Sequence, residues 1–217
     1  MQIACLHTAA SNIDVFERAA GKLGLSAGTL RHEVREDLLD AVECAGGITA
    51  TIADETAAIL LKLAQEADAV ILTCSTLGPA VDSISAMSYV PILRVDIAIA
   101  ERAIAIGGMI VVLCAAETTM AATSRLFSDA IQHSLVSSVH ISLVPDAWAL
   151  FKAGRQDAYL STIARSVEHA YEEGATMVVL AQASMADAAE LVNHWPTPIT
   201  SPQSGLMAAI NRISTEI

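Results

Sequence analysis

Val70-Ile71-Leu72-Thr73-Cys74-Ser75-Thr76-Leu77-Gly78-Pro79 is an apolar run, starting at Ala69, that ends abruptly in a thiol, hydroxyl groups, a glycine and a proline. A buried strand of a parallel sheet has a continuous apolar sequence, and ligands of such sheets bind at the carboxyl ends of the strands. The pattern therefore predicts a buried parallel strand whose carboxyl end carries an active site.

The same pattern occurs a second time in the chain. Val178 to Met185 lies 108 residues after Val70, which is about half of the 217 residues. The offset also superimposes further strand-like segments: 1–6 on 109–114 and, with one residue of slippage, 91–94 on 198–201. Three strands that repeat in the same order predict a duplicated α/β architecture of two similar lobes with parallel sheets.

Strands and helices alternate along the whole chain. The apolar runs predict strands at 2–6, 29–34, 69–72, 91–94, 109–113, 138–144, 176–181 and 198–200. Helical spacing predicts helices at 13–23, 35–45, 54–66, 77–87, 96–106, 119–133, 157–173, 185–193 and 203–215, with Asp54 and Asp146 as N-caps. We place the lobe boundary after Gly107, giving lobes 1–107 and 108–217, with a last helix that is able to cross back.

Composition and charge restrict the partners of this chain. Hydrophobic residues make up 53%, aromatic residues only 4%, and the formal net charge is −12 with no basic cluster longer than two residues. Nucleic acid and anionic membranes are therefore not expected as partners. The amino terminus leads directly into strand-like sequence and no apolar run approaches about 18 residues, so we expect a cytoplasmic protein.

The four cysteines differ in their surroundings. They show no CxxC spacing and no nearby pair of histidines, so neither a metal site nor a disulfide framework is expected. Cys5 and Cys114 lie inside apolar strands and are expected to be inert core residues, and Cys44 lies on a helix. Cys74 alone is placed for chemistry.

Cys74-Ser75-Thr76 at a strand end resembles the Cys-x-Thr motif of the aspartate/glutamate racemase superfamily. That superfamily includes glutamate, aspartate and hydantoin racemases, maleate isomerases and arylmalonate decarboxylases. The duplicated halves, the pair Thr118-Thr119 and the run Leu180 to Met185 extend the resemblance over nearly the whole chain. It implies a cofactor-free site in the cleft between two flavodoxin-like lobes, with one cysteine from each lobe facing the substrate carbon, and it makes a homodimer plausible.

The chain departs from that arrangement at one position. Under the 108-residue offset the counterpart of Cys74 is Gln182, and an amide does not exchange a proton at ordinary pH. The two-thiol mechanism is therefore not available, and this chain resembles a single-cysteine member of the superfamily.

Cys74 is the expected acid/base or nucleophile, acting as a thiolate. We expect the amides at the start of the helix predicted from Leu77 to stabilise that thiolate and, with nearby hydroxyls, to bind a carboxylate. His7, which ends the first strand, is the candidate second acid/base. The expected substrate-binding residues are Thr8, Ser11, Ser75, Thr76, Thr118, Thr119, Gln182 and Ser184, although helix capping explains the hydroxyl groups equally well.

These residues predict a cofactor-independent racemase or isomerase that acts next to the carboxylate of a small acid, such as an amino acid or a dicarboxylate. One alternative is a single-thiol decarboxylase or cis–trans isomerase on the same scaffold. Another is a catalytically inactive protein that binds a small carboxylate. His32 and His140 coincide under the offset but lie away from the predicted carboxyl ends, so we expect structural or surface roles for both.

Overall fold

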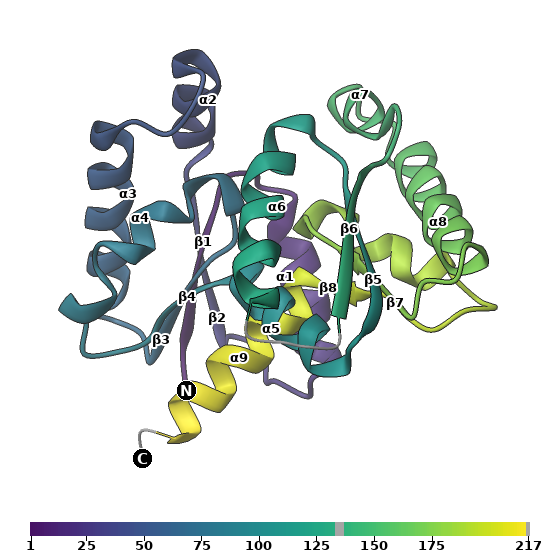
Figure 1. Cartoon of the computed structure of the whole chain (residues 1–217). Coiled ribbons are helices and arrows are strands. Elements are labelled where there is room, and N and C mark those ends of the chain that lie inside the picture. The colour runs from purple at the N-terminus through teal and green to yellow at the C-terminus, as the bar shows by residue number, and fades with distance from the viewer. Residues whose placement is uncertain (133–136, 216–217) are drawn as a thin grey trace. The chain divides into compact units, whose positions relative to one another are not determined.

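The strands of the computed structural model, which describes residues 1–132 and 137–215, form two parallel four-stranded sheets (Figure 1). The first has the order β2-β1-β3-β4 and the second the order β6-β5-β7-β8. Their bounds are β1 Ile3–His7, β2 Leu30–Val34, β3 Ala69–Leu72, β4 Ile92–Arg94, β5 Gly108–Cys114, β6 Ser137–Leu143, β7 Met177–Leu180 and β8 Ile199–Thr200. The repeated order confirms the α/β fold with two similar lobes.

The contacts divide the chain into two compact units. The first holds Met1–Ala98 together with the last helix from Pro202 onward, and the second is Ile99–Ser201. The division at 98/99 differs from the expected one after residue 107, because the buried residues of α5 (Val95–Ile106) from Ile99 onward pack against β5 and β7 of the second sheet. Helix α9 (Ser201–Thr215) crosses back to the first unit.

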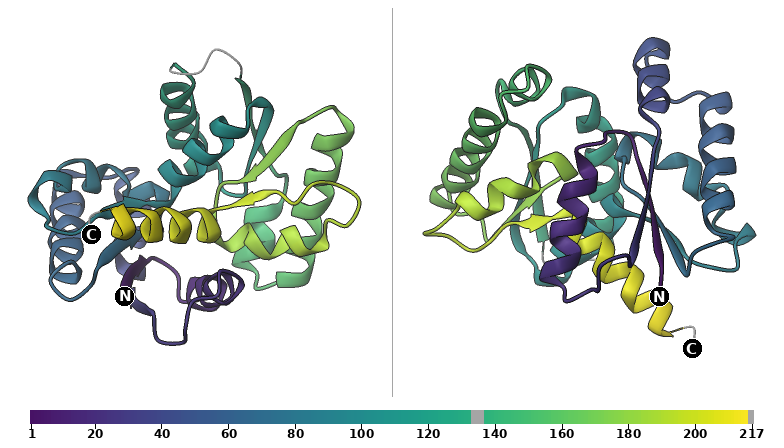
Figure 2. Two further views of the ribbon diagram at one scale, coloured as in Figure 1. Left: turned by 90° about the horizontal axis from the view of Figure 1, so that it is seen from below. Right: turned by 180° about the vertical axis from the view of Figure 1, so that it is seen from behind.

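Helices lie on both faces of the first sheet. Figure 2 (right) shows α1 (Asn12–Lys22) on the opposite side of the strands from α2 (Glu36–Ala45) and α3 (Ala50–Leu63). Because successive side chains of a strand point to opposite faces, Ala4 and Leu6 pack against α2 and α3, whereas His7 packs its ring against Phe16 of α1. The face toward α1 carries His7 and the side chains it bonds, Thr73 and His32, whereas Cys74 packs against the cluster of α2 and α3 on the other face.

Replacing Leu60 by alanine should lower the free energy of unfolding by about 2–5 kcal/mol, because its side chain is 0% exposed in the cluster between α3 and the first sheet. The matched control is Leu61→Ala, since its neighbour on the same helix is only partly buried and should lose less. Urea unfolding of both variants measures the difference. Equal losses would contradict the assignment of Leu60 to the core.

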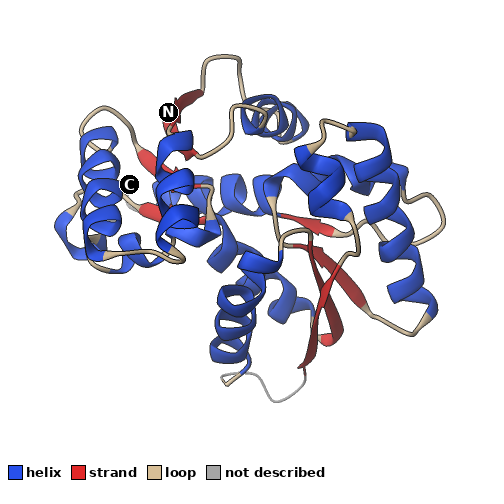
Figure 3. Ribbon diagram, turned by 90° about the horizontal axis from the view of Figure 1, so that it is seen from above, coloured by secondary structure: helices blue, strands red, loops and turns tan. Residues whose placement is uncertain are grey.

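The second sheet is also covered on both faces (Figure 3). One core contains Tyr159 and Ile163 of α8 (Gln156–Glu172) together with α7 (Ala147–Lys152) and η3 (Ala183–Leu191). The other contains Phe127 of α6 (Glu117–Ile131) and residues of α5. Within residues 1–132 and 137–215, no helix has the length and apolar character needed to cross a lipid bilayer.

Several predicted element boundaries were wrong. Helix α3 begins at Ala50 and not at Asp54, because the Thr49 hydroxyl accepts a hydrogen bond from the Ile52 amide at 3.4 Å. Asp146 precedes α7 in a left-handed conformation and makes no side-chain cap. The helix predicted at 185–193 is a 3₁₀ helix, η3. The predicted end of α6 at His133 lies outside the described residues.

Candidate active site

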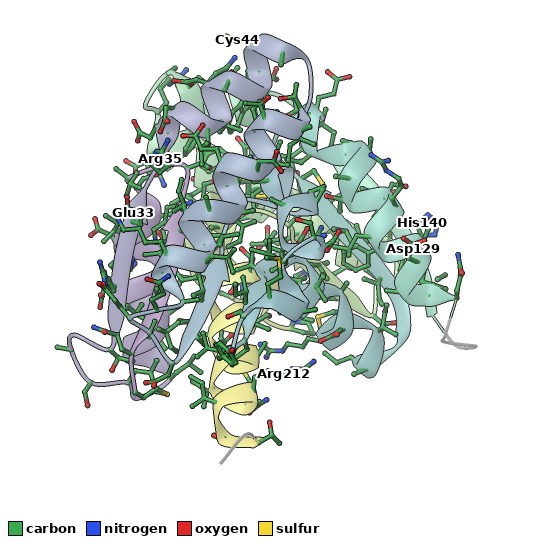
Figure 4. All side chains as sticks on the ribbon, turned by 90° about the vertical axis from the view of Figure 1, so that its left-hand side faces the viewer. Glu33, Arg35, Cys44, Asp129, His140 and Arg212 are labelled. Carbon is green, nitrogen blue, oxygen red and sulfur yellow. The ribbon has the colours of Figure 1, made fainter. Side chains whose placement is uncertain are left out.

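Cys74 lies two residues beyond the end of β3, in an extended conformation, and its side chain is partly exposed. Cys5 and Cys114 are buried within strands. Cys44 is exposed near the end of α2, where Figure 4 labels it, away from the edge of the sheet. Of the four cysteines, all of which the structure describes, Cys74 alone combines a strand's carboxyl end with access to solvent.

Ser75 and Thr76 follow Cys74 in η1 (Ser75–Leu77) and are also partly exposed. The predicted helix 77–87 was wrong, because this segment consists of η1, the single turn α4 (Pro79–Asp82) and η2 (Ser85–Met87). A macrodipole needs several aligned peptide units, so these turns do not supply the helix N-terminus that was expected beside the thiol. Together with Thr73, the two hydroxyls are the nearest polar side chains in sequence to Cys74.

Arg94 packs against the loop that follows Ser75 and Thr76. Its Nε and Nη2 donate to both carboxylate oxygens of Asp96, at 3.1 and 2.8 Å, and its Nη1 donates to Asp82 of α4 at 3.1 Å. A Cβ atom added to Gly78 would lie 2.5 Å from Arg94 Nη2, so the guanidinium packs directly on the loop backbone. An ion pair with two parallel hydrogen bonds, such as that of Arg94 with Asp96, is stronger than one with a single hydrogen bond.

His7 is fully buried next to the Cys74 segment, with both ring nitrogens in hydrogen bonds. Its Nδ1 lies 2.9 Å from Thr73 Oγ1, and its Nε2 lies 2.9 Å from Nδ1 of His32. Burial, and then the neighbouring His32, lower the pKa of His7 to about 3. The imidazole is therefore neutral at neutral pH, and exchanging a proton with a substrate would require breaking one of these bonds.

The hydrogen-bonded chain continues beyond His7. His32 Nε2 lies 3.0 Å from Oε1 of Glu17 on α1, so the chain links β3, β1, β2 and α1. Sequence reasoning assigned His32 a structural or surface role and did not consider Glu17. The alternation of Leu30, His32 and Val34 along β2 was the one signal that places His32 on the face toward α1.

The first connection, between β1 and α1, carries Thr8 and Ser11. Leu6 pairs with Leu72, and continuing this register places Thr8 beside Cys74. Thr8 is buried. Ser11 is exposed at the N-cap position of α1 and makes no side-chain capping bond, so its hydroxyl is accessible.

In the second unit, Gln182 follows β7 at the position that corresponds to Cys74. Leu6 pairs with Leu72 in the first sheet, and Leu113 pairs with Leu180 in the second. Superposition of the two sheets therefore places Cys74 on Gln182, as the 108-residue offset predicts. It places Leu6 on Leu113, which is one residue before the position that the offset predicts. Gln182 Oε1 accepts hydrogen bonds from the Ala115 and Ala116 amides at 2.6 and 3.1 Å. Its carbonyl oxygen is thus occupied, and its amide group is the donor left for a ligand.

The predicted hydroxyl residues of the second unit, Thr118, Thr119 and Ser184, differ in whether their side chains hydrogen-bond within the protein. Thr118 and Thr119 lie in the first turn of α6 and not at a strand end. Thr118 is exposed, whereas Thr119 is buried and donates to the Ala116 carbonyl at 2.7 Å. Ser184 lies 2.8 Å from the hydroxyl of Tyr159, a buried residue missed from the sequence, and burial raises the pKa of Tyr159 to about 12.

The structure therefore gathers Cys74, Ser75, Thr76, His7 and Thr8 at the carboxyl edge of β1 and β3 in the first unit. Gln182 and the amides of Ala115 and Ala116 form the corresponding edge of the second unit. The duplicated parallel sheets, each with polar residues beyond its two central strands, define a two-lobed α/β protein.

Comparisons with known proteins identify the family. The sequence profile of the Asp/Glu/hydantoin racemase family matches residues 29–209, and the chain belongs to that family. Glutamate racemase isoform RacE1 from Bacillus anthracis has a similar structure, with a TM-score of 0.71, 13% identity, and 99% of this chain and 82% of that chain covered.

Two further solved structures show the same fold. Allantoin racemase from Klebsiella pneumoniae matches with a TM-score of 0.68 and 13% identity over 100% of this chain and 89% of that one. Picrophilus torridus aspartate racemase matches with a TM-score of 0.68 and 11% identity over 99% of this chain and 95% of that one. No curated protein sequence matches the chain.

Proposed function

We propose that this protein is a cofactor-independent isomerase that acts at the carbon next to the carboxylate of a small acid, with Cys74 as its acid/base or nucleophile. One observation carries the proposal: in a member of the Asp/Glu/hydantoin racemase family, the partly exposed thiol lies just beyond the central strand β3. The solved relatives are described as glutamate, aspartate and allantoin racemases, which supports carbon-acid chemistry.

In the proposed reaction the Cys74 thiolate removes the proton on the carbon next to the carboxylate. The electron pair of the broken C–H bond moves toward the carboxylate and forms an enediolate, and a proton is then returned to carbon. The hydroxyls of Ser75 and Thr76 follow the thiol directly and are suited to donate hydrogen bonds to the developing negative charge. His7 is proposed to position Thr73, next to Cys74, through its 2.9 Å hydrogen bond.

Because Gln182 stands where a second cysteine would lie, the chain favours a reaction that needs only one thiol. The Gln182 side chain has no proton to exchange at neutral pH, and its oxygen is held by two backbone amides. Its amide group is suited to hydrogen-bond a substrate carboxylate. A cis–trans isomerisation by addition of Cys74 to an unsaturated diacid, or a decarboxylation followed by protonation from Cys74, is the second candidate function.

Proton NMR in D₂O tests the proposal with a panel of amino acids, hydroxy acids, unsaturated diacids and malonates. The expected result is loss of an α-proton signal, or conversion of one panel member, that vanishes in Cys74→Ala. Stereoinversion, alkene isomerisation and loss of carbon dioxide separate the two candidate functions. If no compound reacts but one raises the melting temperature, the protein is a carboxylate-binding protein and the proposal fails.

Replacing Gln182 by cysteine should create or accelerate racemisation, because it places a second thiol at the position that corresponds to Cys74 and frees the amides of Ala115 and Ala116 to stabilise its thiolate. Chiral chromatography of the amino acid found by NMR measures the gain. Gln182→Ala is the control, since it frees the same amides without adding a thiol. Equal rates in both variants would contradict a role for the second thiol.

A further inference from the structure

Three side chains of metal-binding type meet on the α1 face of the first sheet. Cys5 pairs with His32 across β1 and β2, and His7 lies two residues beyond Cys5 on the same face. The nearest ligand atoms of Cys5, His7 and His32 all lie within 4.8 Å of one another. Cys5 and His7 are 0% exposed, whereas the His32 side chain is 12% exposed and gives access from solvent.

The outer hydrogen bonds of the two histidines direct their inner nitrogens toward each other. Thr73 Oγ1 donates to the Leu6 carbonyl at 2.9 Å, so it accepts from His7 Nδ1 and leaves a lone pair on His7 Nε2. The Glu17 carboxylate accepts from His32 Nε2, which leaves His32 Nδ1 on the inner side. With these bonds in place, the lone pairs of the two inner nitrogens, 2.9 Å apart, face each other, and a metal ion between them would be bound by both.

We propose that this cluster binds one divalent transition metal ion of the zinc type through Cys5 Sγ, His7 Nε2 and His32 Nδ1. Thiolate and imidazole are the ligands that such ions prefer, and three protein ligands leave one position open. Binding releases the Cys5 thiol proton, and the proton between the two histidines where it is present, to solvent. The metal site shares His7 with the candidate active site, but its formation does not rest on the proposed reaction at Cys74.

The surroundings of the ligands fit this assignment. A metal-bound histidine typically donates its other N–H to a carboxylate or another acceptor, as His32 does to Glu17 and His7 does to Thr73. Zn–N bonds of about 2.0–2.1 Å in tetrahedral geometry require the two nitrogens to be about 3.3 Å apart. The inner nitrogens therefore have to separate by a few tenths of an ångström, which a rotation of the partly exposed His32 ring supplies.

Two electrostatic effects act in opposite directions at the cluster. Burial, and then Glu17, raise the pKa of the Cys5 thiol, which opposes thiolate formation in the metal-free protein. A bound dication reverses this preference, because a coordinating thiol is deprotonated by the metal charge. His7 is already in the neutral form that metals bind.

Titration of the full, EDTA-treated protein with Co²⁺ or Zn²⁺ tests the site. The expected result is one equivalent of Co²⁺ per chain with a thiolate-to-cobalt charge-transfer band, and displacement of that band by Zn²⁺. Cys5→Ala lacks the thiolate ligand and should not show the charge-transfer band. His32→Ala lacks one imidazole ligand and should not bind one equivalent of the metal. Glu17→Gln should weaken binding by about 10- to 100-fold, because the carboxylate only orients His32.

Matched controls separate this site from surface binding. His140, exposed on β6 and labelled in Figure 4, and Cys44 are the control residues, and their replacement by alanine should leave the stoichiometry and the band unchanged. His32 is partly exposed, so His32→Ala should stay folded even if the buried Cys5→Ala does not, and circular dichroism checks both. Absence of one-equivalent binding, or binding that persists in His32→Ala, would overturn the proposal.

Discussion

Cys74→Ala is expected to lower kcat/KM by about 10²- to 10⁴-fold on whichever acid the NMR panel identifies, because a positioned acid/base group contributes about that factor. The side chain is only partly buried, so the fold should persist and circular dichroism should be unchanged. KM should change little if the carboxylate is held mainly by other groups. Initial rates of proton exchange or conversion measure the effect.

Two further variants make this result specific to the thiol. Cys74→Ser keeps the size and hydrogen bonding of the side chain but not its acidity, so it should be nearly as impaired as Cys74→Ala. Cys44→Ala removes the exposed thiol near the end of α2 and should retain full activity. If Cys74→Ala were as active as the wild type, the acid/base group would have to be a different residue.

Most of the fold follows from the sequence because parallel strands have a strong signature. The buried run 69–72 and its counterpart in β7 are continuous apolar segments, and their repetition predicts the duplicated sheets. Element ends were less predictable. The Thr49 cap and the broken segment after Leu77 depend on single hydrogen bonds and short turns, which have no periodicity in the sequence.

The candidate site was predictable only where a residue lies at, or two or three residues beyond, the carboxyl end of a strand. Cys74, Ser75 and Gln182 meet that condition. The hydrogen bonds that join His7 to His32 and His32 to Glu17 depend instead on strand register and on the position of α1. A shift of one residue in register would place His32 on the other face. The Gln182 bonds to the Ala115 and Ala116 amides likewise depend on the pairing of β5 with β7.

Acid should destabilise the metal-free protein through His7. The pKa of His7 is about 3 in the folded chain, lowered by burial and by His32, against about 6.5 for an unperturbed histidine. Between these values the unfolded chain binds a proton that the folded chain does not. The free energy of unfolding is therefore highest above pH 6.5 and should fall below it, with a slope that approaches about 1.4 kcal/mol per pH unit.

Urea unfolding in EDTA between pH 6.5 and pH 4.5 measures this slope before most carboxylates titrate. His7→Asn keeps a donor for Thr73 but cannot be protonated, so it should lose most of the pH dependence even though its stability at pH 7 is lower. His169→Asn is the control, because that side chain is 68% exposed on α8 and should leave the slope unchanged. An equal slope in wild type and His7→Asn would show that another group takes up the proton on unfolding, and that His7 is not held neutral by its burial.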